Sequence, residues 1–486
     1  MDNRGQLAIE GMADIALNNW WLFCGILVIL MQVGFMLFEG GCVRKINQPG
    51  IAIKNTLMLF ASILGFTLFG YRLLYGETFA WGVIGNYFTL GSKDHGLSWQ
   101  FCQTGYAIIT ATIMSGAIAG RTQLRANVIA AFVVTAFVYP TVAHWIWGNG
   151  WLATVWQAHD FAGSGTVHFV GGIAAAMGAW VAAPRWHRAY KNFRHGNLIR
   201  LVKTSKPLGP RELSLATFGV VFLTIGWMGF NGGNIQSETG LVVDSKGDSL
   251  VGVYFLATAC AAAGGIFSVT IIDALRFRRG PGLFLIDPFA SLAGAMGGMV
   301  AITAVVDLIP NIYYGFTVGL AGGITTYLAS RFVRLFLELD DPVDAIAVHA
   351  GGGIAGVLLV AGFSEKYDIL GQIVFLASAG LFTGVIMLFL FLILDDFHCL
   401  RCSIRDEIDG LTFCPDYVTF DPIPEVRPHI ISHRRPRLPK RMPPAFDPRA
   451  MPRRIRTIIT FLVAISVVLS PGYKPIWEFF RGLILQ

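Results

Sequence analysis

Charged side chains are scarce in this sequence of 486 residues: only 14% are Asp, Glu, Lys or Arg, while 54% are hydrophobic. A soluble globular domain carries about 25% charged residues, so this shortage excludes an ordinary soluble protein. The formal net charge of +7 would suit a nucleic-acid binder. The charges lie between apolar runs and in the C-terminal tail, however, and this distribution predicts no nucleic-acid partner.

Catalytic and metal-binding patterns are also missing. No segment pairs a nucleophile with a base, forms a phosphate-binding glycine loop or shows a metal motif of standard spacing. His398, Cys399, Cys402 and Cys414 come nearest to a zinc site, but their spacing matches no standard finger. We therefore expect no enzyme, no metal and no cofactor.

Cysteine is infrequent as well, with seven residues, an odd number. Cys24, Cys42, Cys102 and Cys260 lie in or beside apolar segments, where a thiol behaves mainly as a small hydrophobic group. No disulfide framework is indicated. A cleavable signal peptide is not indicated either, because the first apolar run begins near Trp20 and is long enough to span a bilayer.

Long apolar runs are what the sequence does contain. Each is about as long as a helix that crosses a membrane, and a helix satisfies its own backbone polar groups there. We therefore predict an all-α polytopic membrane protein with eleven transmembrane helices. The runs lie at 20–38, 51–71, 99–119, 126–147, 161–183, 214–233, 250–272, 283–306, 312–330, 343–362 and 370–394.

The distribution of Lys and Arg predicts the orientation. One alternating set of loops holds 17 basic residues, and the opposite set, including 1–19, holds five. The positive-inside rule then puts the N-terminus outside and the tail after Asp395 in the cytoplasm. An odd number of spans agrees with that. We expect a multi-pass protein of the plasma (cytoplasmic) membrane, in contact with lipid.

Two pairs of segments repeat across the chain. Residues 167–174 and 348–355 are identical at six of eight positions, and 34–41 resembles 226–233, with offsets of 181 and 192. A five-helix unit repeated in this way, at about 20–183 and 214–362, gives two copies of opposite orientation. Such an inverted repeat has its substrate path at the interface of the copies.

Histidine occupies equivalent places in the two copies, as His168 and His349. Ionisable residues at membrane depth are costly and usually mark a conduction path or a proton relay, and imidazole can donate from one nitrogen and accept at the other. Asp160 and Asp344 precede them near the starts of their helices. They are interpreted first as helix-terminal charges, and alternatively as fixed charges that favour a cation.

Aromatic residues gather toward the predicted outer side, as Tyr106, Trp147 and Phe230. Most aromatics in membrane proteins pack or line the interface. A cluster at the mouth of a path could also hold a small cation through its ring faces.

Four motifs together resemble the ammonium transporter (Amt/Mep/Rh) family over roughly 18–412. They are LFEGGCVRKIN at 37–47, DFAGSGTVH at 160–168, GWMGFN at 226–231 and DDPVDAIAVH at 340–349. The resemblance implies an eleven-helix inverted repeat assembled as a homotrimer, with one pore for ammonium or ammonia in each subunit.

The resemblance also implies residue roles. His168 and His349 match the twin histidines of the pore, and Trp147 matches the tryptophan of the outer ammonium site. Phe230 matches the inner ring of a two-phenylalanine gate. Asp160 matches the carboxylate near the site, with Asp344 as its counterpart in the second half.

Three positions depart from the family pattern. Tyr106 stands where the outer gate phenylalanine is usual, Asn234 where a serine hydroxyl often lies, and Cys102 replaces an aromatic residue. Tyr and Asn still offer a ring face and a carbonyl acceptor. The outer site is therefore expected to be more polar than usual.

The C-terminal part differs from the transmembrane domain at 1–394. Residues 395–454 are hydrophilic, with ten prolines between Pro415 and Pro452, and are expected to be extended or docked on the cytoplasmic face. Arg405–Leu411 resembles the family's regulatory tail motif, which implies contact with a neighbouring subunit and suggests a cytoplasmic regulatory protein as a partner. Within 455–486, the apolar run at 457–470 is short for a span and is either an additional helix, an interfacial helix or the start of a further segment.

These observations favour an ammonium transporter or channel. Ammonium would bind at the outer aromatic site and lose a proton, and ammonia would pass the histidines, with the proton either following or staying outside. The alternative is an ammonium sensor with the same fold and little or no flux. The altered outer site and the extra C-terminal segment motivate that alternative, while the lack of an output domain in 486 residues argues against it.

Overall fold

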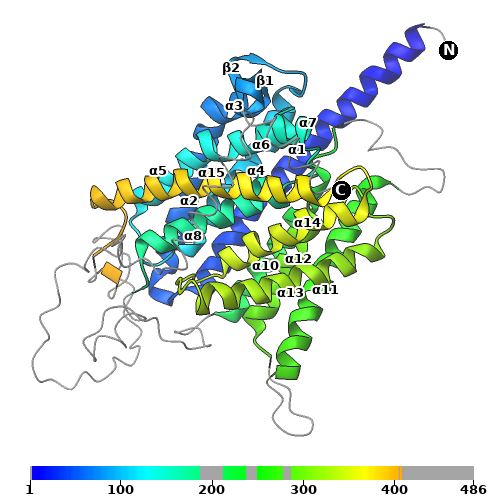
Figure 1. Cartoon of the computed structure of the whole chain (residues 1–486). Helices are drawn as coiled ribbons and strands as arrows, with labels where there is room; N and C mark the ends of the chain where they lie inside the picture. The colour runs from blue at the N-terminus through cyan, green and yellow to red at the C-terminus, as the bar shows by residue number, and fades with distance from the viewer. Residues whose placement is uncertain (1–2, 186–211, 237–248, 277–285, 404–405, 408–486) are drawn as a thin grey trace, which may run out of the picture.

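Long helices dominate the protein, and they pack side by side into one bundle (Figure 1). The computed structural model describes residues 3–185, 212–236, 249–276, 286–403 and 406–407. The elements of the first half are α1 (Asn3–Cys42), η1 (Lys45–Asn47), α2 (Gln48–Gly65), η2 (Phe66–Gly70), α3 (Tyr71–Tyr75), β1 (Gly76–Phe79), η3 (Ala80–Gly82), β2 (Ile84–Leu90), α4 (Leu97–Ala117), α5 (Leu124–Val133), η4 (Val134–Val138), α6 (Tyr139–Trp147), α7 (Trp151–Val155), η5 (Ser164–Phe169) and α8 (Val170–Ala182). The second half contains α10 (Leu213–Gly232), α11 (Leu250–Arg276), α12 (Pro288–Ile302), α13 (Tyr313–Leu335), η7 (Ile346–Gly351), α14 (Gly352–Phe363) and α15 (Ile369–Asp396).

Eight helical segments within the described residues are long and apolar enough to cross a membrane. They are Gly11–Cys42, Lys45–Tyr75, Leu124–Val155, Ser164–Ala182, Leu213–Gly232, Leu250–Arg276, Ile346–Phe363 and Ile369–Asp396. The other three expected spans correspond to α4, α12 and α13, which fall short of that standard. Helix α12 has only 15 residues, and α4 carries polar side chains that face the protein interior, such as Thr110 and Thr112. The polytopic membrane fold is therefore supported, and the count of eleven spans stays a prediction.

A small β-hairpin corrects the all-α expectation. Strands β1 and β2 pair antiparallel, with Thr78 opposite Gly85 and Phe79 opposite Ile84, at one end of the bundle (Figure 1). Threonine and aromatic residues in these strands favour extended backbone. Between the strands, Trp81 and Gly82 have φ values of 57° and 87°, which reverse the chain. The hairpin lies between the apolar runs at 51–71 and 99–119, in a stretch that was expected to be only a loop.

Helices α1 and α10, which end in the similar segments 34–41 and 226–233, lie against each other. Their approach depends on glycine: a Cβ placed on Gly219 would lie 2.5 Å from the Phe38 backbone nitrogen. Helix α1 also packs on α4, most of whose residues are buried. Helices α11, α12 and α13 pack on one another, and α15 runs along the outside of the bundle (Figure 1).

The helices that carry the two histidines cross closely at Gly172 and Gly353. A Cβ on Gly172 would lie 2.5 Å from the Ala350 backbone nitrogen, and one on Gly353 would lie 2.5 Å from the Ser164 carbonyl oxygen. These glycines are separated by 181 positions, as are His168 and His349. Small residues let two helix backbones approach so closely that no side chain would fit between them. The crossing therefore brings the two repeated segments into contact.

The start of the C-terminal tail packs on the bundle. Arg401 donates hydrogen bonds to the carbonyl oxygens of Ala182 and Pro184, at 2.7 and 2.8 Å, and pairs with the Glu407 carboxylate at 2.8 Å. Arg44 donates to the Glu407 carbonyl oxygen. The other segments for which the sequence made predictions in the tail lie outside the described residues. They are the Pro-rich part of 395–454, most of Arg405–Leu411, Cys414 and the apolar run at 457–470.

Candidate functional site

The two repeated histidines meet in the middle of the bundle. Nδ1 of His168 lies 3.2 Å from Nδ1 of His349, and the rings are stacked with 5.2 Å between centroids and an interplanar angle of 15°. Their residues are 0% and 3% exposed. One Nδ1 must carry a hydrogen and the other a lone pair, because two N–H groups or two lone pairs would repel.

Each histidine sits in a π-helical turn, η5 for His168 and η7 for His349. Such turns are rare and occur often at functional sites. In η5 the His168 backbone N–H donates to the Gly163 carbonyl oxygen at 3.0 Å. Gly163 has a φ of 113°, in the region that favours glycine, so the turn before the histidine requires this residue.

Aromatic rings extend the histidine pair in both directions into a continuous column. From Trp147 the successive centroid distances are 6.0 Å to Tyr106, 4.2 Å to Phe230, 5.2 Å to His168, 5.2 Å to His349 and 6.0 Å to Phe35. The residues expected in the pore and the gate therefore follow one another in a continuous series of ring contacts. We call its two ends the Trp147 end and the Glu39 end, because Glu39 lies beyond Phe35 on α1.

Trp227 belongs to the site although it was not assigned from the sequence. Its ring stacks on His168 at 4.9 Å with an interplanar angle of 19°, and its Nε1–H donates to the Thr303 hydroxyl at 2.9 Å. The hydrogen bond fixes the indole, and the indole fixes one face of the imidazole. The signal was present, since Trp227 lies one helical turn before Phe230 in the motif at 226–231.

The four residues expected at the outer site are all buried and joined by contacts. Nε1–H of Trp147 donates to the Asp160 carbonyl oxygen at 2.7 Å, and the Tyr106 hydroxyl donates to the Phe230 carbonyl oxygen at 2.5 Å. The Asn234 side chain donates to the Phe161 carbonyl oxygen.

Two further contacts complete this end. Gln103, which the sequence did not single out, donates to the Asn234 side-chain oxygen at 3.3 Å. The Cys102 thiol lies 3.8 Å from the Gly233 carbonyl oxygen. Cys102 therefore lies one helical turn before Tyr106 on α4, and Asn234 contacts the same helix through Gln103.

The Asp160 carboxylate organises the turn that leads to His168. It accepts hydrogen bonds from the backbone N–H groups of Gly163, Gly165 and Thr166 at 3.1, 2.9 and 2.8 Å, and from the Thr166 hydroxyl at 3.1 Å. Burial raises the pKa of this carboxyl, and these hydrogen bonds oppose that effect. Asp160 is therefore a structural acceptor at the start of η5.

Asp341, rather than Asp344, makes the equivalent contacts in the second half. Its carboxylate accepts from the backbone N–H groups of Val343 and Ile346 at 3.1 and 2.8 Å, and burial raises its pKa to about 6. Asp344 instead pairs with Arg334 at 3.3 Å near the surface. The assignment of Asp344 as the counterpart was therefore wrong. The signal that identifies Asp341 is its offset of 181 from Asp160.

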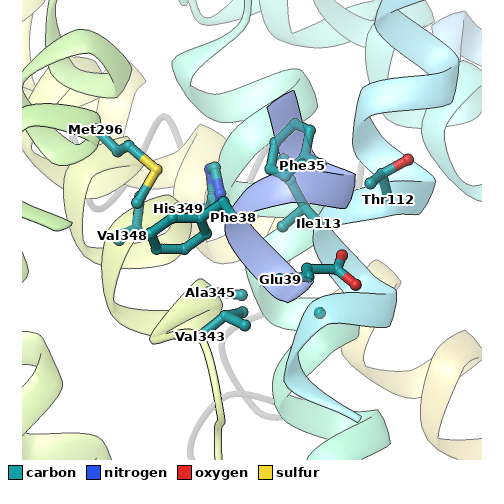
Figure 2. A pocket seen from close by; sticks show the side chains of 11 residues that line it. Phe35, Phe38, Glu39, Thr112, Ile113, Met296, Val343, Ala345, Val348 and His349 are labelled. Carbon is teal, nitrogen blue, oxygen red and sulfur yellow. The ribbon is translucent and has the colours of Figure 1, made fainter. Parts of the chain in front are cut away.

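A cavity of about 10 Å³ lies beside His349 at the Glu39 end (Figure 2). That volume holds about one water molecule. Most of its lining residues are apolar, and the lining also includes three polar residues, Glu39, Thr112 and His349. The apolar lining comes from Phe35, Phe38, Ile113, Gly116, Met296, Val343, Ala345 and Val348.

Comparisons with known proteins show which family the chain resembles. The profile of a family described as Ammonium Transporter Family matches residues 19–414. A putative ammonium transporter of Synechocystis is 35% identical over 84% of this chain and 90% of its own length. The ammonium transporter Amt1 of Archaeoglobus fulgidus is 29% identical over 81% of this chain and 95% of its own. A solved structure called Sensor Amt Protein superposes with a TM-score of 0.74 at 29% identity, covering 84% of this chain and all of that one.

Proposed function

Because the chain belongs to the ammonium transporter family, we propose that ammonium crosses the membrane along the column of rings from Trp147 to Phe35. The cation binds at the Trp147 end and loses a proton, and ammonia passes the histidine pair. The observation that carries this proposal is the direct Nδ1–Nδ1 contact of His168 and His349 inside that column.

The deprotonation step follows from the cost of moving a charge. Burying a charge at the centre of a membrane costs at least about 2.5–3.5 kcal/mol, and a cation over an aromatic ring gains about 0.5–2 kcal/mol. Trp147 and Tyr106 lie at 81° to each other, so an ion at the mouth can contact both. Rings deeper in the column are too closely stacked to surround an ion, which favours passage of the neutral molecule.

Asn234 and Cys102 complete the proposed outer ammonium site. The side-chain oxygen of Asn234 accepts one hydrogen bond from Gln103 and keeps a second lone pair for an ammonium N–H. Cys102 supplies a polarisable wall one turn before Tyr106.

Tyr106 and Phe230 form the proposed gate. Their ring centroids are 4.2 Å apart, so a molecule passing between them needs one ring to move. The hydrogen bond from the Tyr106 hydroxyl to the Phe230 backbone holds the two rings together, which a phenylalanine at position 106 could not do.

The histidine pair offers a route for the proton as well. If His168 carries its hydrogen on Nδ1, its Nε2 is a free acceptor, and His349 carries its own hydrogen on Nε2. His168 takes up a proton at Nε2, its Nδ1 hydrogen passes to Nδ1 of His349, and His349 releases the proton from its own Nε2. One proton has then entered at His168 and one has left at His349, and both tautomers are reversed. Transport by this route is electrogenic. If the proton stays outside, transport is electroneutral.

The wider architecture belongs to the same proposal. It comprises eleven spans in an inverted five-helix repeat within 1–394, a cytoplasmic tail at 395–454 and a further apolar segment at 455–486. The equivalent contacts at Asp160 and Asp341 support the repeat. We further propose a homotrimer in the plasma membrane with the N-terminus outside, so that the Trp147 end faces out and the Glu39 end faces the cytoplasm.

The test is the current across proteoliposomes after an ammonium concentration jump, in wild type and in His349→Ala. We expect a saturable current in wild type that is lost in the variant. His144→Ala is a control for the loss of a buried histidine, because the His144 ring is not a member of the column and its Nδ1 contacts the Leu74 carbonyl oxygen. A current that survives His349→Ala would contradict the relay, and an ammonia-driven pH assay would then measure electroneutral flux.

A sensor is the alternative function. The solved structure called Sensor Amt Protein covers 84% of this chain, and the start of the tail is tied to the bundle through Arg401. A protein that binds ammonium saturably but gives neither current nor ammonia flux would favour this alternative. Ammonium flux through the purified protein, measured without any partner protein, would favour the transporter.

A further inference from the structure

A buried ion pair lies beside the cavity at the Glu39 end. Lys54 donates to the Glu39 Oε2 atom at 2.6 Å and to the Ser115 hydroxyl at 2.8 Å. Asn55 also donates to Glu39 Oε2, at 3.3 Å. The side chains of Glu39 and Lys54 are 1% and 5% exposed, so the pair is removed from solvent.

The other carboxylate oxygen of Glu39 is left free. Oε1 is buried and has no hydrogen-bond partner among the described residues. Figure 2 shows the Glu39 carboxylate between Thr112 and the Val343–Ala345 segment, in the lining of the cavity that also contains His349. A buried, charged acceptor without a partner is costly, and a ligand that donates a hydrogen bond would remove that cost.

We propose that Glu39 Oε1, together with Thr112 and His349, forms a second binding site for ammonium, at the end of the column opposite Trp147. Its place on the transport path rests on the proposed function, whereas its ability to bind ammonium does not. Nothing in the sequence comparison assigns a role to Glu39 or Lys54.

The chemistry of the cavity selects a small cation with N–H donors. Its volume of about 10 Å³ admits a particle the size of water or ammonium. The carboxylate oxygen and the Thr112 hydroxyl can both accept from ammonium, whose four N–H groups have no acceptor role. The surrounding apolar side chains strengthen these contacts, because charges interact more strongly where water is excluded.

Lys54 makes the site weak enough to empty. A cation at Oε1 lies next to the carboxylate, whereas Lys54 contacts the other oxygen and is therefore farther from the bound ion. Attraction exceeds repulsion, but the lysine cancels part of it. A site at an exit needs this property, since a carboxylate without a counter-ion would retain the cation.

The test removes the pair as a unit. A single Glu39→Gln variant would leave Lys54 buried without its counter-ion, and such a change often prevents folding. The double variant Glu39→Gln/Lys54→Met replaces both charges by neutral groups of similar size, which proteins usually tolerate. The control is Glu212→Gln/Lys45→Met, because Lys45 and Glu212 form a pair near the same end whose side chains are 60% and 43% exposed.

Binding is measured without relying on transport. In a Trp147→Leu background, which removes the first site, ammonium chloride should still raise the midpoint of thermal unfolding relative to sodium chloride at equal concentration. We expect this ammonium-dependent rise to disappear when the double Glu39/Lys54 variant is added and to persist with the Glu212/Lys45 control. A rise that survives the loss of Glu39 and Lys54, or that is already absent in Trp147→Leu alone, would overturn the second site.

The flux measurement then locates the site on the path. With Trp147 intact, the double Glu39/Lys54 variant should lower the maximal ammonium flux at least tenfold, while the half-saturating concentration at the Trp147 end changes less than twofold. Equal maximal flux in this variant and in the control would remove the site from the path. A wild type that binds ammonium but gives no flux would contradict the proposed transport alone, because the thermal measurement tests the second site independently.

Discussion

The substitution Asp160→Asn tests whether a buried carboxylate holds the histidine turn in place. The carboxylate accepts four hydrogen bonds, one at Oδ1 from Gly163 and three at Oδ2 from Gly165 and Thr166. An asparagine keeps one oxygen, and its NH₂ group then faces at least one backbone N–H. An unpaired buried donor costs about 1–3 kcal/mol, and each remaining bond loses about 1 kcal/mol with the charge.

With three remaining bonds, the expected loss of stability is therefore about 4–6 kcal/mol, and His168 loses the turn that orients it. Asp344→Asn is the matched control, since its pair with Arg334 at 3.3 Å is partly exposed and contributes about 0–1 kcal/mol. Thermal unfolding in detergent, followed by tryptophan fluorescence, should give a clearly lower midpoint for Asp160→Asn, with flux reduced in the same variant. Equal midpoints in the two variants would refute this account of Asp160.

Three further substitutions test the column. Tyr106→Phe removes the hydroxyl that donates to the Phe230 carbonyl oxygen, so maximal flux in proteoliposomes should rise as the gate opens more easily; a fall would contradict the gate. Gly172→Val places a side chain against the Ala350 backbone, which should cost at least about 1–3 kcal/mol in detergent unfolding; a neutral result would contradict the close crossing. Trp227→Leu removes the ring stacked on the first histidine and should reduce flux more than ammonium binding, as measured by thermal shift; equal losses would refute its positioning role.

The sequence predicted the centre of the site well because the centre is repeated. His168 and His349 are related by the same offset of 181 that relates Gly172 to Gly353, and the structure brings both pairs together. The same offset applied to Asp160 identifies Asp341. The prediction chose Asp344 as the carboxylate near the start of the helix that carries His349. Asp344 lies five residues before that histidine, whereas Asp160 lies eight residues before His168, so position near a helix start was a poorer guide than the repeat.

Features that depend on packing between distant segments could not be read from the sequence. The free oxygen of Glu39 is defined by Lys54 and Asn55 occupying the other one, and no pattern along α1 shows which oxygen that is. The hairpin of β1 and β2 was missed for a different reason, because its strands are shorter than the windows that reveal membrane helices.

The arrangement of polarity along the column explains how one path could admit a cation at its ends and exclude it from its centre. At the Trp147 end, ring faces and the Asn234 amide can contact a charge that still keeps part of its water. In the middle, Phe230 and Trp227 contact the His168 ring on two sides, so an ion there would exchange its water for apolar surface. At the Glu39 end, the lining of a cavity includes Glu39, whose Oε1 is buried without a hydrogen-bond partner among the described residues. Since a neutral molecule has no such cost in the centre, this gradient favours ammonia inside the proposed path and ammonium at its two ends.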